Sequence, residues 1–221
     1  MDKYLNKIIC GDCLEVLKGL PDNSVDLVLT DPPYGIDYSR HIKHLKHNKI
    51  ENDNNLDWLP LFISEMNRLL KKSGSCYIFC SWHNIEIFKK EIEKHFNIRN
   101  MLIWDKGGLG MGDLKTTYGS VYEICLFCNK EPQLLNGNRD SDLLRQKRSG
   151  NKLHPTEKPI ELIKYLVTKS SNENDIVLDP FLGSGTTAVA CKQLKRNYIG
   201  IELSEEYCSI AKKRLEQDVL F

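Results

Sequence analysis

The sequence lacks several features that would place it in a class of protein at once. It has little net charge, because 31 Lys and Arg residues are balanced by 30 Asp and Glu residues. No apolar run approaches the ~20 residues that span a bilayer, and the polar start is unlike a secretory signal. We also find no internal repeat and no low-complexity linker. These absences exclude a membrane-spanning, fibrous or disordered protein and favour a cytoplasmic location.

The length and composition predict one compact domain over residues 1–221. The chain has 221 residues, 41% of them hydrophobic, so it can bury a large core without disulfides or a structural metal. Eight cysteines include two pairs with C-x-x-C spacing, Cys10 with Cys13 and Cys125 with Cys128. The second pair lies in an alternating apolar stretch, where residues three apart point to opposite faces of a strand. We therefore predict no metal site and interpret the cysteines as small buried residues.

Apolar runs of strand length recur along the chain and alternate with helical patterns. The predicted strands are residues 7–10, 25–30, 75–80, 100–104, 121–128, 175–178 and 197–201. Helical spacing of apolar residues occurs over residues 59–69, 85–92, 160–167 and 207–215. This alternation predicts an α/β fold with a seven-stranded, mostly parallel sheet covered by helices on both faces. The Gly-rich stretch 107–119 joins two strands without a helix and predicts an antiparallel hairpin at a sheet edge.

Two long stretches without apolar periodicity, residues 36–55 and 130–153, are predicted to be surface loops. Because the net charge is small, any nucleic-acid site must be a local patch, and both loops are basic. The candidate residues for such a nucleic-acid patch are Arg40, Lys43, Lys46, Arg145, Lys147 and Arg148. Solvated connections are the simpler interpretation, but loops this long in compact domains are usually functional or disordered.

A glycine turn follows the strand at 175–178. Asp179 precedes Gly183 and Gly185, and the next pattern is helical, so backbone N–H groups can face a ligand there. Gly183, Gly185 and Ala188 match the relaxed dinucleotide fingerprint, and Glu202 after the next strand could bind ribose hydroxyls. A P-loop is excluded, because no Lys-Ser or Lys-Thr pair follows the last glycine.

The negative charge of Asp179 at this turn distinguishes between two kinds of adenosine cofactor. A pyrophosphate is disfavoured beside the carboxylate of Asp179, whereas the ammonium and sulfonium of S-adenosylmethionine are cationic and are favoured there. A nicotinamide-dependent oxidoreductase built on the fingerprint and Glu202 remains the alternative from another class.

A second constellation, Asp31-Pro32-Pro33-Tyr34, follows the buried strand 25–30. Its place predicts a position at a carboxyl end of the sheet, where open α/β folds bind ligands. The prolines stiffen the loop, which leaves the Asp31 carboxylate and the Pro32 carbonyl as acceptors near the Tyr34 ring. Two acceptors and an aromatic face suit a planar base with an exocyclic amine, although a stiff turn with a surface tyrosine would show the same pattern.

These residues resemble the amino-methylating DNA methyltransferases, in the subgroup whose catalytic motif precedes its cofactor motif. The resemblance covers nearly the whole chain. It rests on the Asp31 motif, the Asp179 to Gly185 loop, the segment His154 to Pro159, and Gly11-Asp12, in the family's order. It implies a Rossmann-like methyltransferase fold and S-adenosylmethionine as cofactor.

The resemblance also implies the roles of individual residues. Asp31, Pro32 and Tyr34 would be catalytic. Cofactor contacts would come from Asp12, Asp31, Thr156, Lys158, Asp179, Phe181, Gly183, Ser184, Gly185, Thr186 and Glu202. Among these, Asp12 would bind the adenine amine and Glu202 the ribose. Lys158 would pair with the carboxylate of the cofactor's methionine end.

The expected activity is site-specific transfer of a methyl group to N6 of an adenine flipped out of double-stranded DNA. In this family Asp at the first motif position usually accompanies adenine N6 transfer and Ser accompanies cytosine N4 transfer. Cytosine N4 remains the alternative, because both amines fit the same acceptors. Residues 107–153 would contribute to target recognition, and the loop 36–55 would close over the flipped base. The sequence leaves open a homodimer and a cognate restriction endonuclease as partners.

Overall fold

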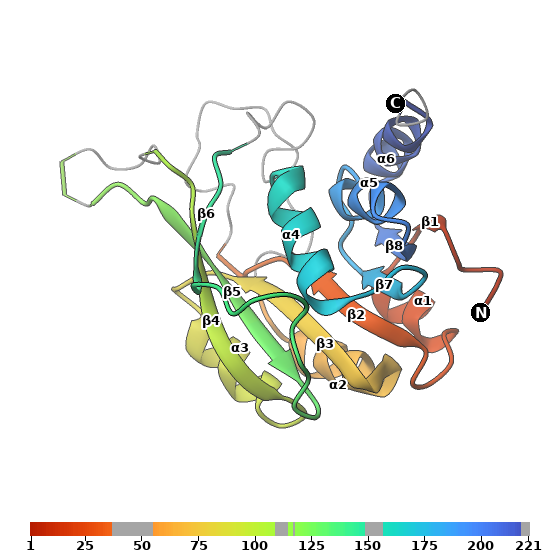
Figure 1. Ribbon diagram of the computed structural model, residues 1–221, viewed down its shortest axis with the longest axis horizontal. Helices are drawn as coiled ribbons and strands as arrows, with labels where there is room; N and C mark the ends of the chain where they lie inside the picture. The colour runs from red at the N-terminus through yellow and green to blue at the C-terminus, as the bar shows by residue number, and fades with distance from the viewer. Residues whose placement is uncertain (37–54, 109–114, 117, 149–156, 218–221) are drawn as a thin grey trace.

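The structure is a computed structural model that describes residues 1–36, 55–108, 115–116, 118–148 and 157–217. Within these residues eight strands form a single sheet, and six helices cover it (Figure 1). No helix in this part of the chain combines the length and the apolar composition needed to cross a membrane.

The elements follow the predicted alternation of strands and helices. The strands are β1 (Lys7–Cys10), β2 (Val25–Thr30), β3 (Leu70–Cys80), β4 (Asn97–Asp105), β5 (Tyr122–Asn129), β6 (Leu143–Arg145), β7 (Ile176–Asp179) and β8 (Asn197–Glu202). The helices are α1 (Cys13–Lys18), α2 (Leu59–Leu69), α3 (Ile85–Ile92), α4 (Ile160–Ser170), α5 (Thr186–Gln193) and α6 (Glu205–Gln217).

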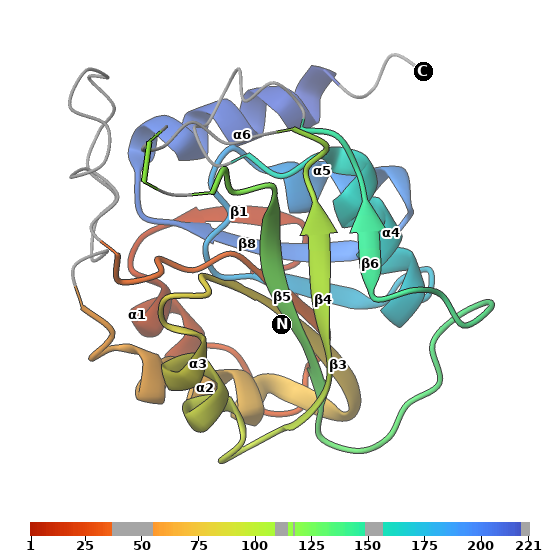
Figure 2. The same ribbon diagram turned by 90° about the vertical axis from the view of Figure 1, so that its left-hand side faces the viewer.

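The strand order is β1-β8-β7-β2-β3-β5-β4-β6. The first five strands of this order pair in parallel, and β5 pairs antiparallel with both β3 and β4. This confirms the predicted mostly parallel sheet with an antiparallel hairpin. Because β5 is the one reversed strand among those described, its beginning lies at the same edge of the sheet as the ends of the others (Figure 2).

Two details of the predicted sheet are corrected. The segment 130–153, predicted as a loop, contains an eighth strand, β6, which pairs in parallel with β4. The hairpin of β4 and β5 therefore does not form the sheet edge, because β6 occupies it. A strand of three residues has no periodicity to detect, and pairing with its neighbour holds it in place. The indole Nε1 of Trp104 adds a hydrogen bond of 2.7 Å to the carbonyl of Gln146 just beyond β6.

Each face of the sheet is covered by three helices (Figure 1). Alternation along β2 sends Val28 into the cluster with α1, α2 and α3, and Leu27 into the cluster with α4, α5 and α6. Cys125 and Cys128 on β5 likewise pack into opposite clusters, as their spacing predicted.

Two helices lack the amphipathic pattern that identifies the others. α1 has only six residues, which is too short for a periodic signal. α5 is buried along Thr186 to Cys191, so no polar face alternates with an apolar one. Its beginning was nonetheless marked by the glycine turn, because Gly185 adopts φ +92° at the N-cap.

The parallel strands bring the acidic loops together at one edge, which we call the carboxyl edge. Asp179 ends β7, Glu202 ends β8, and Asp31 follows the last residue of β2. β7 pairs with β2 on one side and with β8 on the other. The three carboxylates therefore share the carboxyl edge at neighbouring strands, the usual location of a ligand site in an open α/β sheet.

Candidate active site

The Asp31 carboxylate is held by two side chains of the chain itself. The hydroxyl of Tyr34 donates to Oδ1, and the ammonium of Lys158 donates to Oδ2. Asn84, just before α3, donates a hydrogen bond of 2.6 Å to the Tyr34 carbonyl. The loop is thus fixed at both its carboxylate and its tyrosine. Since each carboxylate oxygen has two lone-pair sites, both oxygens of Asp31 can still accept a hydrogen bond from a substrate.

Lys158 belongs to an alternating network of buried charges. Its ammonium also lies 3.1 Å from Oε2 of Glu123 on β5, and Oε1 of Glu123 lies 3.3 Å from the Lys106 ammonium. Only 7% of the Lys158 side chain is exposed, and its Nζ lies 4.8 Å from the centre of the Phe79 ring. The network runs from Asp31 through Lys158 and Glu123 to Lys106.

This geometry adds two partners for Lys158 that the sequence did not predict. Its ammonium pairs with Asp31 and Glu123, and its predicted contact with the carboxylate of a cofactor stays a prediction. A buried ammonium needs compensating charge, and two carboxylates of the chain already supply it.

Burial shifts the ionisation of these groups. Burial, reinforced by Glu123, raises the pKa of Asp31 against the opposing effect of Lys158. Burial and the neighbouring Asp31 raise the pKa of the Tyr34 hydroxyl well above its usual value. For Glu123 burial acts upward, but the cations of Lys158 and Lys106 outweigh it and lower the pKa. Glu123 is therefore the firmly ionised carboxylate of the network, and Asp31 is the more basic one.

Asp179 is fixed by the glycine loop that follows it. Oδ1 accepts from the Phe181 N–H at 3.1 Å, and Oδ2 accepts from the Thr187 hydroxyl at 2.6 Å. Burial, together with the charges of Asp31 and Glu202, raises the pKa of Asp179 to about 7. An acid this easily protonated marks a position where a bound cation would restore the ionised form.

Glu202 and Asp12 line the same edge in different ways. The Glu202 carboxylate accepts the N–H groups of Gly183 and Ser204, each at 2.8 Å, and so ties the end of β8 to the glycine loop. Asp12 is exposed and caps α1, accepting the Leu14 N–H at 2.8 Å. It lies near Glu202, because Cys10 at the end of β1 is in register with Glu202.

Two residues predicted to contact the cofactor, Ser184 and Thr186, have side chains that are already hydrogen-bonded. The Arg214 guanidinium on α6 donates to Ser184 Oγ at 3.0 Å and to Thr186 Oγ1 at 3.2 Å. Arg214 also forms an ion pair of 3.0 Å with Glu157, and so joins α6 to the segment before α4. We therefore expect Ser184 and Thr186 to contact a ligand through the main chain, where the helix N-terminus offers N–H groups.

Phe181 belongs to an aromatic cluster with Trp58 and Phe62, with ring centres 5.3 to 5.5 Å apart. The indole Nε1 of Trp58 is buried and has no hydrogen-bond acceptor among the described residues. A buried donor without a partner costs free energy, so this N–H group indicates a position where a ligand could place a hydrogen-bond acceptor.

Several predicted residues cannot be placed. Arg40, Lys43, Lys46 and Thr156 lie outside the described residues, as do most of the loop 36–55 and His154. The predicted DNA-binding residues of the segment 130–153 are described. Arg145 ends β6 with 77% of its side chain exposed, and Lys147 and Arg148 follow it on the surface. These three side chains lie at the carboxyl edge, because β6 runs parallel to β4. Their role in binding DNA and that of residues 107–153 in target recognition stay predictions.

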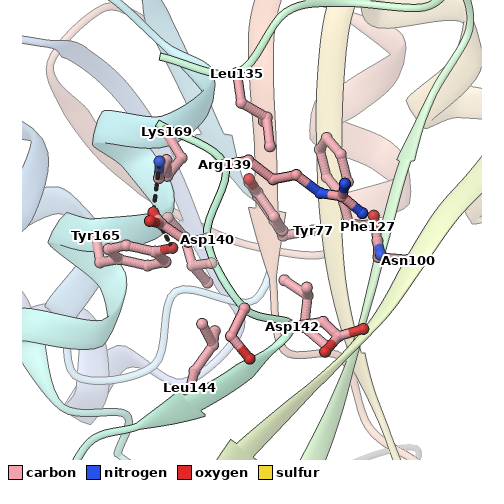
Figure 3. A pocket seen from close by; sticks show the side chains of 13 residues that line it. Tyr77, Asn100, Phe127, Leu135, Arg139, Asp140, Asp142, Leu144, Tyr165 and Lys169 are labelled. Atoms are coloured by element: carbon pink, nitrogen blue, oxygen red, sulfur yellow. Dashed lines mark hydrogen bonds and ion pairs between the residues drawn. The ribbon is translucent and has the colours of Figure 1, made fainter. Parts of the chain in front are cut away.

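A separate cavity of about 350 Å³ lies between α4 and the strands β3, β4 and β5 (Figure 3). Its walls include Tyr77 and Phe127, whose rings stack 4.9 Å apart. Asp140 in this cavity is already bound to Lys169 at 2.6 Å and to the Tyr165 hydroxyl at 2.9 Å. None of the residues that line it belongs to the Asp31 network or to the glycine loop, so the acidic carboxyl edge is the candidate site.

A mostly parallel sheet with a stiff Asp-Pro-Pro-Tyr loop beside an acidic glycine turn is the arrangement expected of an enzyme that methylates an exocyclic amine. Comparison with known proteins identifies the particular family. The sequence profile described as "DNA methylase", of the N6/N4 methyltransferases, matches residues 25–213. The chain belongs to this family of DNA methyltransferases.

Individual relatives resemble the chain over nearly all of its length. It is 34% identical to "DNA adenine methyltransferase YhdJ" of Escherichia coli, over 95% of this chain and 82% of that protein. It is 33% identical to "Type II methyltransferase M.HpaI" of Haemophilus parainfluenzae, over 96% of this chain and 74% of that protein. The solved structure of the M1.HpyAVI–SAM complex is 31% identical with a TM-score of 0.73, covering 95% of this chain and 99% of that one. The match confirms the fold and the family inferred from the motifs, and the oxidoreductase alternative is set aside.

Proposed function

We propose that this DNA methyltransferase transfers a methyl group from S-adenosylmethionine to N6 of an adenine extruded from double-stranded DNA. The observation that carries the proposal is the fixed Asp31 carboxylate, held by Lys158 and Tyr34 next to the strand that carries Asp179. The choice of adenine is supported by Asp at the first motif position and by the likeness to a protein named as a DNA adenine methyltransferase.

The residues at the carboxyl edge fit S-adenosylmethionine. Asp31 and Glu202 both raise the pKa of Asp179, so the edge carries closely spaced acidic groups that favour the ammonium and sulfonium of this cofactor. The buried indole donor of Trp58 beside Phe181 suits an acceptor atom of its adenosine part. Asp179, Phe181, Gly183, Gly185, Glu202 and Asp12 would hold it. When bound, the cofactor supplies an electrophilic methyl group on a cationic sulfur.

Asp31 would orient the substrate amine. The lone pair of an adenine amine is delocalised into the ring, which makes the nitrogen a poor nucleophile. Hydrogen bonds from its two N–H groups to the Asp31 carboxylate and the Pro32 carbonyl would favour a pyramidal nitrogen with a directed lone pair. Lys158 and Tyr34 restrict the rotation of the carboxylate, so these hydrogen bonds can form without reorganisation.

The same carboxylate would stabilise the charge that develops on nitrogen. As the new N–C bond forms, the nitrogen becomes positive and its protons become acidic. Asp31 is a stronger base than an exposed aspartate, because burial raises its pKa. We therefore assign the departing proton to an oxygen of Asp31. The nearby Lys158 ammonium opposes this effect of burial and favours the ionised form of Asp31.

The free-energy cost of extruding the base would be offset by contacts between the DNA and the carboxyl edge. Breaking a base out of the stack costs a few kcal/mol, and stacking on the ring of Tyr34 returns about 1 to 3 kcal/mol. Phosphate contacts from Arg145, Lys147 and Arg148 would contribute the rest. Whether the chain acts as a homodimer or beside a cognate restriction endonuclease stays a prediction, to be checked by light scattering and by assays of neighbouring gene products.

The test is to identify the modified nucleoside. The purified protein is incubated with S-adenosylmethionine and unmethylated duplex DNA, the DNA is digested, and the nucleosides are identified by mass spectrometry, with Asp31→Ala as the inactive control. We expect N6-methyladenine, and sequencing of the methylated DNA then gives the target site. N4-methylcytosine as the sole product would refute the choice of adenine, and transfer only to RNA or peptide would refute the choice of DNA. Thermal shifts with S-adenosylhomocysteine and with NAD test the cofactor separately, because only the former should stabilise the protein.

A further inference from the structure

Exposed aromatic side chains lie at the carboxyl edge, outside the site described above. Trp82 follows β3 and is 58% exposed, and Tyr122 begins β5 and is 39% exposed. The strands pair Cys80 with Ile124, and each aromatic residue stands two positions beyond this pair toward the carboxyl edge. With His83 they form what we call the aromatic edge.

The Trp82 ring is held in place although most of it is exposed. It stacks on the His83 ring with centres 3.9 Å apart and an angle of 29° between the planes. The His83 ring is in turn fixed by a hydrogen bond of 3.0 Å between its Nδ1 and the Ser81 hydroxyl. A large aromatic surface is thus presented to solvent in a defined orientation, and little conformational entropy is lost when a second ring stacks on it.

The aromatic edge is connected directly to the Asp31 loop. Asn84, two residues after Trp82, donates its hydrogen bond of 2.6 Å to the carbonyl of Tyr34. Thr30 and Ile78 are in register on adjacent strands, so both chains leave the sheet together at this edge. Two residues span at most about 7 Å, so the backbone of Trp82 lies within that distance of Asn84, whose side chain binds the Asp31 loop.

Basic side chains accompany the aromatic ones. Arg145, Lys147 and Arg148 end or follow β6 at the carboxyl edge, and all three are exposed. Exposed aromatic rings beside cations are the combination that binds unstacked nucleotides, because the rings stack on bases while the cations neutralise phosphates. The substrate of the family is DNA, so a nucleobase is the ligand that this surface fits.

We propose that Trp82, supported by His83 and Tyr122, stacks on a nucleobase exposed in the DNA when the target adenine is extruded. The inference rests on the proposed function, because it requires an extruded base. Trp82 contacts no reacting group in this scheme. It stabilises the opened duplex and thereby raises the fraction of bound DNA that is ready for transfer.

The experiment compares Trp82→Ala, Trp82→Phe and the control Leu61→Ala, which removes a side chain that is 50% exposed on α2. The substrate is a duplex with the mapped target, and a second duplex carries 2-aminopurine at the target adenine to report extrusion by fluorescence. We expect Trp82→Ala to lower kcat/KM on the duplex about 5- to 150-fold, the range for loss of one base stack, and to reduce the 2-aminopurine signal. A target that is already mispaired should lessen the defect. Trp82→Phe should stay within about threefold of the wild type, and all variants should bind S-adenosylhomocysteine equally.

The possible results distinguish a failure of the proposed function from a failure of the stacking role of Trp82. A wild-type protein that neither methylates nor extrudes adenine refutes the proposed function. A wild-type protein that does both, together with a Trp82→Ala variant that matches it on the paired duplex, overturns the stacking role. The stacking role is also overturned if Trp82→Ala loses as much kcat/KM on the mispaired target as on the paired one, because a stacked ring should matter less when the duplex is already open. It is overturned as well if Trp82→Phe loses as much as Trp82→Ala, because phenylalanine keeps a ring that can stack. Quenching of Trp fluorescence on binding DNA, absent in Trp82→Phe, gives a direct measurement that does not rely on Trp82→Ala folding.

Discussion

The ammonium of Lys158 donates a hydrogen bond to the carboxylate of Asp31, which lies 127 positions earlier in the chain. The two residues belong to motifs that the sequence presents as separate, one predicted to bind substrate and the other cofactor. In the folded protein they form one buried ion pair with Glu123 as a second anion. The orientation of the Asp31 carboxylate therefore depends on residues from three distant parts of the chain.

The first prediction concerns Asp31 itself. Asp31→Asn keeps the shape of the side chain but removes the charge that would stabilise and accept the amine proton, so we expect methyl transfer to fall about 10²- to 10⁴-fold. Affinity for S-adenosylhomocysteine should change only a few-fold. Radiolabelled methyl transfer and calorimetry measure the two quantities. Near-normal turnover in a folded Asp31→Asn protein would contradict the catalytic role.

The second prediction concerns Glu123. Glu123→Gln removes the anion between Lys158 and Lys106, and we expect a loss of about 1 to 3 kcal/mol in the free energy of unfolding together with a lower kcat. Lys106→Met is the matched control, because it breaks the outer ion pair and leaves Lys158 between two carboxylates. Its kcat should stay closer to that of the wild type. Equal kcat values in Glu123→Gln and the wild type would show that the network does not position Asp31.

The third prediction follows from the pKa of Asp179, raised by burial from 3.8 to about 7. The folded protein holds this proton more tightly than the unfolded chain, so Asp179 makes stability fall as the pH rises between those values, by at most about 1.4 kcal/mol per pH unit. Asp179→Asn should remove this contribution and flatten the curve. Urea unfolding from pH 4 to pH 8 measures it. Parallel curves for variant and wild type would show that Asp179 does not titrate in this range.

Ligand affinity gives an independent check on Asp179. A cationic cofactor favours the ionised carboxylate, so wild-type affinity for S-adenosylmethionine should increase between pH 6 and pH 8, and less so in Asp179→Asn.

The fourth prediction concerns the close packing of the glycine loop on α6. A Cβ atom on Gly185 would lie 2.7 Å from Cβ of Ala211, at a backbone φ of +92°. Gly185→Ala should therefore cost more than the roughly 1 to 3 kcal/mol of an unfavourable φ alone. Gly107→Ala is the control, because Gly107 has a φ of +70° but its nearest neighbour would be 3.5 Å away. Ala211→Gly should partly rescue Gly185→Ala in denaturant unfolding. Additive effects of the two changes would mean that the two residues do not touch.

The fifth prediction concerns salt. If Arg145, Lys147 and Arg148 bind phosphates, replacing all three with Ala should reduce the slope of log affinity against log salt concentration by about 0.9 for each phosphate that is no longer neutralised. Lys195→Ala is the control. Lys195 is exposed but precedes β8 at the opposite edge of the sheet. Fluorescence anisotropy of labelled duplex DNA at several salt concentrations gives the slopes, and an unchanged slope in the triple variant would exclude this surface.

Much of the fold could be predicted from the sequence, because most elements carry their own signal. The runs at Lys7–Cys10 and Val25–Thr30 are the observed β1 and β2, and the periodicity over residues 59–69 is the observed α2. The signal failed where tertiary contacts decide the structure. β6 exists because it pairs with β4, and α5 is buried on all sides. Neither pairing partners nor full burial are visible in local patterns.

The residues of the candidate site could be predicted from the sequence, but the contacts between them could not. The motifs identified Asp31, Asp179 and Glu202, which the topology brings to one edge of the sheet. The ion pairs of Lys158 with Asp31 and Glu123 were not predicted, because a motif gives no information on contacts across the sheet. Glu123 could have been found, since a carboxylate inside an apolar strand must be buried with a counter-charge. Arg214 carried no such signal, because a charged residue on an amphipathic helix usually faces solvent.

The placement of β1 has a consequence for how this enzyme could be rearranged. β1 is the outermost strand beside β8, and α6 follows β8 directly, so the first strand and the last helix adjoin the same flank of the sheet. Joining the end of α6 to the start of the chain by a linker, and opening the chain between α4 and β7, would place the glycine loop ahead of Asp31 in the polypeptide. Every strand pair would be kept. The linear order of the two motifs is thus a matter of where the backbone is cut, and catalysis by a permuted chain should be retained.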